Sequence, residues 1–372
     1  MKKPRNKKVG IINHWMVNNY GALFLAYALE KVIERMGFDV ESITYLPDEV
    51  KKPWKLSMIK KIGFLTYCFR LGYFIIFILP RKKSFASLRA KMNNSAQVYN
   101  DKTISNIATK YDKFVIGGDQ LWNTKINYYN EVNFLPFIKE PNKKVVYAAS
   151  IAQETIRPEI LNRFTELAND FSYITSREVH TKNLIEKHTG KSAPWVLDPA
   201  FLLQREEWIA LAKPDLSAPA RFIFVYQVQS DVELIEAANK LAKKIKCKVI
   251  FCPFPLKKQI SCTRKPYISP ERWLWYVQNA EYVITDAYHG VVMSLSLNTP
   301  FYAQISSYGA DTKSRITNLL DTLELSDCLF EGNSCPINVE IDFKRVNEFI
   351  AVERECSLSH LSVMLGEEKR SN

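Results

Sequence analysis

The sequence predicts an α/β protein made of two Rossmann-like domains that face each other across a cleft. The first observation behind this prediction is the length of 372 residues, which favours two domains over one. The second is the alternation of short apolar strands with amphipathic helices through both halves, a pattern typical of parallel sheets. The third is that the polar residues best suited to ligand binding follow the carboxyl ends of strands in both halves.

Changes of composition divide the chain into three parts. Residues 1–203 are expected to form the first domain, and residues 220–372 the second, which ends in a closing helix. Residues 204–219 are charged, contain proline and show weak patterning, as an interdomain connection does. Apolar residues make up 47% of the chain, which is enough for full cores.

The charge balance points to anionic partners. Lys and Arg total 51 against 39 Asp and Glu, a net charge of +12, which favours nucleic acid, phosphorylated small molecules or an acidic membrane surface. The basic residues are dispersed or flank apolar runs, so nucleic acid is the weakest of these three. Seven scattered cysteines without a CxxC pair, and an N-terminus without a signal-peptide pattern, predict a cytoplasmic protein with reduced thiols.

The first domain opens with a β-loop-α-β unit. A strand at 9–12 leads through a polar loop to a helix at 22–36 and a second strand at 39–45. The first loop of such a unit is where a parallel sheet places a ligand, so Asn19 and Gly21 are candidates for substrate contact. A plain turn is the alternative.

Residues 51–91 are expected to contact a membrane surface. Lysines precede an apolar, aromatic run at 62–80, and three basic residues follow it directly. A segment of this kind suits the surface of an anionic bilayer. Arg70 inside the run argues against a helix that spans the membrane. A buried helical pair within the first domain is the alternative.

Later strands of the first domain also end in polar residues. The strand at 111–116 runs into two glycines, which let the backbone approach a ligand, and then into Asp119, Gln120 and Asn123, whose side chains offer hydrogen bonds suited to a sugar. Further strands are expected at 144–150, 171–178 and 195–199.

The strand at 171–178 brings Arg177 to the sheet edge. A guanidinium held there would bind a carboxylate or phosphate through two parallel hydrogen bonds. An ion pair with Glu178, or a helix cap, is the alternative.

The second domain repeats the alternation. Strands are predicted at 221–227 and 248–252, from 282 and at 300–304, and helices at 231–245 and 270–279, from 314 and at 343–361. Gln227 is a candidate ligand contact at the end of the first of these strands. Lys313 and Arg315 bring basic side chains to the start of a helix.

Residues 282–297 form the most informative stretch, an apolar strand that stops at a polar tip and turns directly into an apolar helix. Such a junction gathers unpaired N–H groups and the positive end of the helix dipole, which suits an anionic ligand. Asp286, Tyr288 and His289 lie there, and the imidazole could exchange protons with the ligand. The alternative is that Asp286 caps the helix and His289 packs passively.

Several common catalytic motifs are missing from the sequence. It contains no GxGxxG loop, no GxxxxGK[ST] and no HExxH. Nicotinamide chemistry, P-loop nucleotide hydrolysis and zinc hydrolysis therefore have no specific support.

A set of motifs, in this order, resembles the polysaccharide pyruvyl transferase family. The set spans roughly residues 9–320, most of the chain. Its members are Val9-Gly10-Ile11-Ile12 with Asn18-Asn19-Tyr20-Gly21-Ala22, Gly117-Gly118-Asp119-Gln120-Leu121-Trp122-Asn123, Thr175-Ser176-Arg177-Glu178, Leu197-Asp198-Pro199 and Thr285-Asp286-Ala287-Tyr288-His289-Gly290.

The resemblance implies a fold similar to the glycosyltransferase B architecture and an activity that moves the pyruvyl part of phosphoenolpyruvate onto sugar hydroxyls. The product is usually a cyclic ketal, and inorganic phosphate is released. Arg177 would hold the donor's carboxylate or phosphate, and His289 would be the general acid or base. The scheme needs no metal and no cofactor.

One departure from the family pattern concerns the donor cation. Some members carry Arg two residues before the His, where this chain has Ala287. Lys313 and Arg315 are the candidates to replace it. Family members act on varied glycans, often attached to a polyprenyl diphosphate, and residues 51–91 would dock the enzyme where such an acceptor lies, at the inner face of the cell membrane.

Two other functions are open at this point. One is a glycosyltransferase of the same fold that uses a nucleotide sugar and releases nucleoside diphosphate instead of phosphate. The other is a non-catalytic component of a glycan assembly complex, for which His289→Ala would leave function intact.

Overall fold

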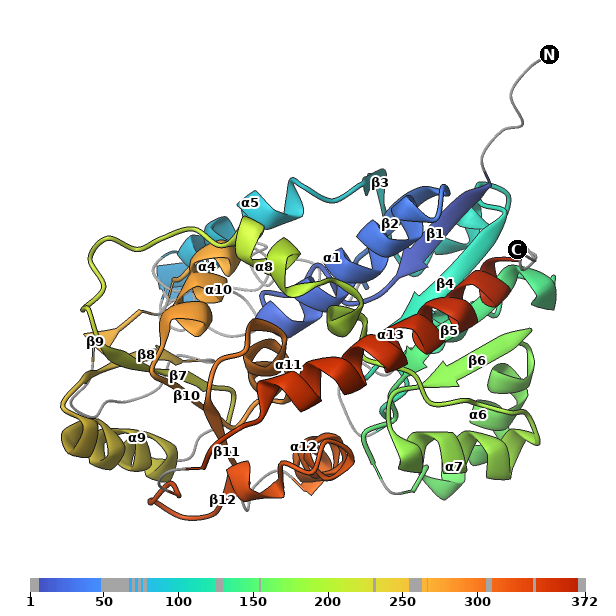
Figure 1. Ribbon diagram of the computed structural model, residues 1–372. Helices are drawn as coiled ribbons and strands as arrows, with labels where there is room; N and C mark the ends of the chain where they lie inside the picture. The colour runs from blue at the N-terminus through green and yellow to red at the C-terminus, as the bar shows by residue number, and fades with distance from the viewer. Residues whose placement is uncertain are drawn as a thin grey trace.

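The computed structural model describes residues 7–47, 67–68, 71–72, 75, 79–124, 130–153, 155–229, 232–253, 263–265, 267–305, 310–336 and 339–366. Two six-stranded parallel sheets form its framework, with strand orders β3-β2-β1-β4-β5-β6 and β12-β11-β10-β7-β8-β9. Counted from the first strand of each half, both orders are 3-2-1-4-5-6, the Rossmann order. The predicted fold, two Rossmann-like domains in a glycosyltransferase B-like arrangement, is confirmed (Figure 1).

The first sheet holds the strands of the N-terminal half. They are β1 (Lys8–Ile12), β2 (Asp39–Tyr45), β3 (Asn94–Tyr99), β4 (Lys113–Gly117), β5 (Lys144–Ala149) and β6 (Tyr173–Ser176). The helices of this half are α1 (Tyr20–Arg35), α4 (Leu79–Ser84), α5 (Ala86–Arg89), α6 (Pro158–Asn169) and α7 (Val179–Thr189). Every residue of β5 is buried, as expected for a parallel strand covered on both faces.

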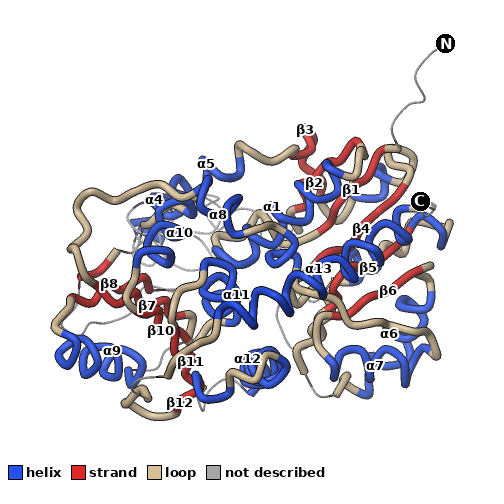
Figure 2. Tube along the Cα trace, in the orientation of Figure 1, coloured by secondary structure: helices blue, strands red, loops and turns tan. Residues whose placement is uncertain are grey.

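The second sheet follows α8 (Arg205–Leu211), which lies in the stretch expected to connect the domains. Its strands are β7 (Phe222–Gln227), β8 (Lys248–Pro253), β9 (Thr263–Arg264), β10 (Tyr282–Thr285), β11 (Phe301–Gln304) and β12 (Leu329–Phe330). The helices are α9 (Val232–Ile245), α10 (Pro270–Asn279), α11 (Tyr288–Leu297), α12 (Ala310–Thr322) and α13 (Phe343–Leu365). Figure 2 shows the strands of the two halves as separate groups with helices packed between and around them.

Aromatic side chains join the two halves. Tyr20 of α1 stacks on Trp273 of α10 with ring centroids 5.5 Å apart, and the tilted ring of Phe24 packs on the same side chain at 5.4 Å. The Tyr20 hydroxyl donates to the Ile268 carbonyl at 2.7 Å. One apolar cluster therefore contains residues of both halves, and the interface is a core in its own right.

The closing helix α13 begins in the second half and packs on the first, as Figure 1 shows. The Leu197 N–H donates to Ser357 Oγ at 3.0 Å, and Arg354 Nε donates to the Phe201 carbonyl at 2.7 Å. The Tyr173 hydroxyl and His360 Nδ1 lie 2.9 Å apart. These contacts fix the segment around Leu197.

The prediction of a strand at 195–199 is wrong, because only Trp195 pairs with the sheet. A single bridge joins Trp195 to Ser176, and the chain then turns into a short 3-10 helix, Pro199–Leu202. Asp198 caps this helix by accepting from the Ala200 N–H at 2.9 Å, and Pro199 fits its first turn.

The expected membrane segment at 51–91 lies mostly outside the described residues. Its last part forms the short helices α4 and α5, in which Arg81 and Leu88 are the buried residues. Arg81 is 7% exposed, and its guanidinium lies 5.6 Å from the centre of the Tyr20 ring. In the described part of the chain, no helix combines the length and the apolar content that a membrane crossing requires.

Candidate active site

The N-termini of α1 and α11 meet where the two halves face each other. Gly21 is the second residue of α1, and His289 is the second residue of α11. A Cβ atom at Gly21 would lie 2.2 Å from His289 Nδ1 and 2.3 Å from Cγ. Only a residue without a side chain leaves room for the imidazole there, so Gly21 serves the packing of His289.

The His289 side chain is 11% exposed and reaches across to the first domain. Its Nε2 lies 3.5 Å from Oδ2 of Asp198. The Tyr288 ring stands edge-on to the imidazole with centroids 5.2 Å apart. The imidazole thus sits between a fixed carboxylate and a polar cavity, a position suited to proton transfer.

Asp198 joins His289 to Arg177. Its Oδ2 accepts from Arg177 Nη1 at 2.6 Å. Burial raises the pKa of the Asp198 carboxyl, but the charges of His289 and Arg177 outweigh burial and hold that pKa well below its usual range. Asp198 is therefore ionised at neutral pH and can orient a ring beside it.

Arg177 is buried and paired with two carboxylates. One of them is Glu178, the ion-pair partner named in the alternative interpretation of Arg177. Besides Asp198, Arg177 reaches Glu178 Oε1 from Nε at 3.1 Å. Burial lowers the pKa of Arg177, but the charges of Asp198 and Glu178 outweigh burial, so the net shift of this pKa is upward. Its Nη2 is also buried and has no hydrogen-bond partner among the described residues. That nitrogen is free to bind a ligand.

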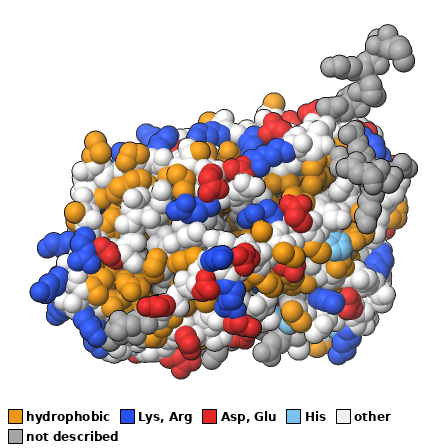
Figure 3. Space-filling view, in the orientation of Figure 1, with side chains coloured by type: hydrophobic (Ala, Val, Ile, Leu, Met, Phe, Trp, Pro, Cys, Tyr) orange, Lys and Arg blue, Asp and Glu red, His pale blue; other side chains and the backbone are white. Residues whose placement is uncertain are grey.

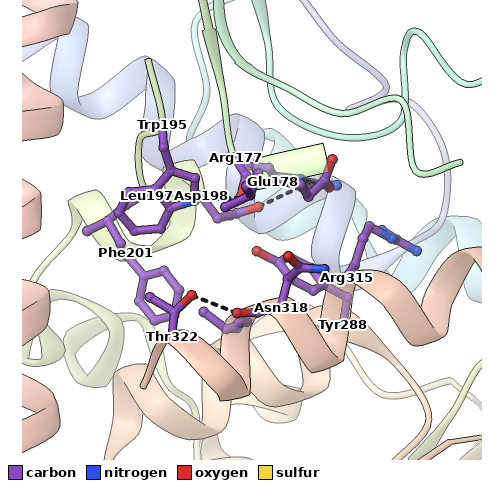
Figure 4. Close-up of a pocket in the computed structure, with 12 residues that line it drawn as sticks. Arg177, Glu178, Trp195, Leu197, Asp198, Phe201, Tyr288, Arg315, Asn318 and Thr322 are labelled. Carbon is purple, nitrogen blue, oxygen red and sulfur yellow. Dashed lines mark hydrogen bonds and ion pairs between the residues drawn. The ribbon is translucent and has the colours of Figure 1, made fainter. Parts of the chain in front are cut away.

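Tyr288 lies between two guanidinium groups. The Arg177 Cζ is 4.9 Å and the Arg315 Cζ is 5.4 Å from the centre of its ring. In Figure 4 Arg177 and Asp198 lie along one side of the pocket, and Arg315 and Tyr288 lie opposite. Burial raises the pKa of Tyr288, so its hydroxyl stays protonated.

Arg315 is 7% exposed and has a different electrostatic setting from Arg177. Burial lowers its pKa, and the positive charge of Arg177 lowers it further. The Gln120 amide oxygen, turned toward Arg315, accepts from Nη2 at 2.5 Å and Nη1 at 2.9 Å. Its Nε is buried without a hydrogen-bond partner in the described part of the chain.

Two adjoining cavities meet at Tyr288 and Arg315. The first has a volume of about 500 Å³, including space open to solvent, and is lined by Asn19, Asp119, Gln120, Tyr226, Val228, Gln229, Asp286, Ala287, Tyr288, His289 and Arg315. The second, of about 360 Å³, is lined by Arg177, Glu178, Val179, Trp195, Leu197, Asp198, Phe201, Tyr288, Arg315, Asn318, Leu319 and Thr322. The first contains His289 and most of the predicted site residues.

Five predicted site residues do not line the first cavity, and one of them is Gly21, which packs against His289. Arg177 lines the second, and Asn123 lies behind Gln120, with its Nδ2 2.9 Å from that amide. Gln227 is buried at the end of β7 and lines neither cavity. The side chain of Lys313 lies outside the described part of the structure.

Asp286 does not cap α11, so that part of the alternative is wrong. The cap is Ala287, without a side-chain hydrogen bond. The Asp286 carboxylate instead accepts from the backbone N–H groups of Val228 at 2.7 Å and Gln229 at 2.8 Å. It thereby holds the loop after β7 at the rim of the first cavity.

Asp119 adds a second carboxylate near His289. Its backbone is left-handed, with φ of 53°. Burial raises the pKa of Asp119, but Arg177, His14 and His289 lower it below its usual value. Asn19 both lines the cavity and caps α1, because its Oδ1 accepts from the Ala22 N–H at 3.2 Å.

Sequence reasoning assigned no role to several residues of the site. Asp198 is the most important of them, since it contacts both Arg177 and His289. Tyr226 and Gln229 line the first cavity. Glu178, which lines the second, was named only as the alternative ion-pair partner of Arg177. Across the described ranges no group of His, Cys, Asp and Glu side chains could hold a metal ion.

Comparisons with known proteins agree on the fold. The family model "Polysaccharide pyruvyl transferase" matches residues 19–303. The UDP-GlcNAc 2-epimerase of Methanocaldococcus jannaschii has a TM-score of 0.50 at 12% identity, over 98% of this chain and 94% of that one. A putative UDP-N-acetylglucosamine 2-epimerase of Listeria monocytogenes has a TM-score of 0.54 at 11% identity, over 98% of both chains. No curated protein matches the sequence.

Proposed function

The chain belongs to the polysaccharide pyruvyl transferase family, and from this premise we propose that it transfers the pyruvyl group of phosphoenolpyruvate to sugar hydroxyls and releases inorganic phosphate. One observation carries the proposal. Two buried guanidinium groups, each with an unpartnered nitrogen among the described residues, lie beside an imidazole that a carboxylate orients. This set provides fixed cations and a proton carrier in one place.

The two arginines suit different parts of the donor. Arg177 is neutralised by Asp198 and Glu178, so its Nη2 offers a directed hydrogen bond more than net charge. Arg315 has a neutral hydrogen-bond partner, Gln120, and keeps its positive charge for the ligand. It is the candidate to replace the cation missing at Ala287, and it lines the same cavity as His289.

The reaction uses His289 as both acid and base. Protonated His289 gives a proton to the donor CH₂ carbon, and the oxocarbenium-like C2 is attacked by one sugar hydroxyl, whose proton returns to the ring. The C2–O bond to phosphate then breaks, phosphate leaves, and a second hydroxyl attacks C2 and gives its proton to the phosphate. The products are a methyl ketal of pyruvate and inorganic phosphate.

We further propose that the acceptor is a polysaccharide precursor on a polyprenyl diphosphate carrier at the inner face of the cell membrane. The donor is the only small molecule that the scheme requires, with no metal and no cofactor. The open side of the first cavity and its polar lining, Asn19, Asp119 and Gln229 among it, support a sugar there.

Phosphate release tests the proposed activity. With phosphoenolpyruvate and a panel of lipid-linked or synthetic oligosaccharides, we expect acceptor-dependent phosphate release and an adduct whose mass matches a pyruvyl ketal. Mass spectrometry of the acceptor checks the adduct. Transfer of a hexose from a nucleotide sugar under the same conditions would contradict the proposal.

Liposome flotation tests the membrane contact. Reversing the charge of Lys51, Lys52, Lys55, Lys60 and Lys61 to Glu is expected to abolish binding to anionic vesicles, because a juxtamembrane basic residue contributes about 1 kcal/mol. The control reverses five exposed lysines in and after α9, where basic side chains gather at one edge of the molecule (Figure 3), namely Lys240, Lys243, Lys244, Lys246 and Lys248. An equal loss of vesicle binding in both variants would show that binding depends on overall charge, and it would contradict a specific role of residues 51–91.

A further inference from the structure

The two ring nitrogens of His289 have unequal surroundings. Nε2 is buried and makes no hydrogen bond within the described residues, and it lies at an ion-pair distance of 3.5 Å from Asp198 Oδ2. The side chain as a whole is 11% exposed, and it lines the first cavity. Because Nε2 faces Asp198, Nδ1 is the ring nitrogen left to exchange a proton with a ligand there.

The Asp198 carboxylate is held rigidly from several directions. It accepts from Arg177 Nη1 through Oδ2 and from the Ala200 N–H through Oδ1. The neighbouring Leu197 is fixed as well, because its N–H donates to Ser357 Oγ and its carbonyl accepts from the Tyr147 hydroxyl at 3.1 Å. A carboxylate fixed in this way selects one orientation of the ring beside it.

Gly21 sets the position of the opposite side of the ring. The backbone of α1 passes so close that a Cβ would overlap Nδ1 and Cγ. The first domain therefore holds the imidazole from two sides, through Asp198 and through Gly21, although His289 belongs to the second domain. Of the carboxylates in the described ranges, Asp198 is the one within 4 Å of a His289 nitrogen.

We propose that Asp198 and Gly21 are positioning residues that hold neutral His289 as its Nε2–H tautomer, with Nδ1 as the proton-transfer atom. Nε2–H points at the carboxylate, and the Nδ1 lone pair accepts the proton that the ligand gives up. The same nitrogen, once protonated, returns it. The identity of the ligand rests on the proposed function, but the tautomer does not.

Nuclear magnetic resonance of ¹⁵N-histidine-labelled protein measures the tautomer directly, without donor or acceptor. The chain has five His residues, and the signal lost in His289→Gln identifies the relevant one. In the unaltered protein, above the titration of the ring, we expect the Nε2–H form. An Nδ1–H form would overturn the inference whatever the enzyme transfers.

Asp198→Asn provides the second measurement, because its amide can donate to Nε2 and favour the Nδ1–H form. We expect the tautomer to change and turnover to fall at least about 100-fold. Asp215→Asn is the matched control, since Asp215 is also held by hydrogen bonds, from Ser217 and Tyr276, but lines neither cavity. An unchanged tautomer in folded Asp198→Asn would contradict the role of Asp198.

Gly21→Ala tests the steric half of the inference. The methyl group must displace the imidazole, and a displacement of about 1 Å can lower the rate about 100-fold. Gly190→Ala is the control, because a Cβ there meets nothing within 4 Å, Gly190 lines neither cavity, and its φ of 70° limits the effect to local backbone strain. Full turnover and an unshifted His289 signal in Gly21→Ala would refute the packing role. If the unaltered protein has the Nε2–H tautomer but transfers no pyruvyl group, that result would refute the proposed function and leave the inference on His289 intact.

Discussion

Replacing His289 by glutamine is expected to lower kcat for pyruvyl transfer about 100- to 10,000-fold, the range that a general acid–base group contributes. The imidazole is the titratable group of the first cavity that Asp198 orients, and glutamine cannot carry a proton between the donor carbon and the sugar hydroxyls. The measurement is acceptor-dependent phosphate release at saturating phosphoenolpyruvate. Donor affinity should change much less, because the arginines remain.

The same substitution should leave the fold nearly intact. Asp198 keeps its ion pair with Arg177 when the imidazole is removed, so the free energy of unfolding should fall by no more than about 2 kcal/mol, a hydrogen-bond contribution. His188→Gln on α7, which lines neither cavity, is the matched control and should keep full turnover. A His289→Gln enzyme with unimpaired turnover would assign this chain to the non-catalytic class.

Secondary structure was predictable where local signals were strong. The helix expected at 270–279 matches α10, because Ser269 caps it and Pro270 occupies its first turn. Helix α1 begins two residues before the expected Ala22, because Asn19 is its cap as well as a cavity residue. A cap and a ligand contact use the same residue types, so the sequence alone could not separate them.

The strand β3 was not predicted from the sequence. It lies at the edge of the first sheet, and three consecutive residues in it are exposed. A strand of this kind has neither the continuous apolar run of a central parallel strand nor a clear alternation. Its place depends on pairing with β2, which is a tertiary contact.

The site was predictable in its parts but not in its connections. The rule that ligands bind at the carboxyl ends of parallel strands placed Arg177, Asp119 and His289 correctly at facing sheet edges. The link between Asp198 and His289 joins residues 91 positions apart in separate domains. Likewise, the sequence indicated Gly21 only as a loop glycine, and the structure shows that the imidazole of His289 packs against it. Sequence patterns carry no information on contacts between domains.

Arg177→Gln and Arg315→Gln should have opposite effects on stability although the two arginines flank the same tyrosine. Removing Arg177 leaves Asp198 and Glu178 buried without their cation, which should lower the free energy of unfolding by about 3–5 kcal/mol. Chemical denaturation of the two variants measures the difference.

Arg315→Gln should be neutral or stabilising. Burial and the charge of Arg177 lower the pKa of Arg315, so folding disfavours its charged form. An uncharged side chain removes that penalty, while Gln120 can still make a hydrogen bond to the new amide. A loss of stability as large as that of Arg177→Gln would show that Arg315 is a structural residue.

Donor binding should respond to Arg315 in the opposite direction. A hydrogen bond to a charged group contributes about 1.5–3 kcal/mol, so Arg315→Gln should raise KM for phosphoenolpyruvate about 10- to 100-fold, with KM for the acceptor unchanged. Arg315→Lys keeps the charge but loses the planar fork, and it should recover part of the affinity. A variant that gains stability while it loses donor affinity is the expected sign of a cation kept in a buried site for its ligand. If Arg315 served the fold alone, its replacement would lower stability and donor affinity together.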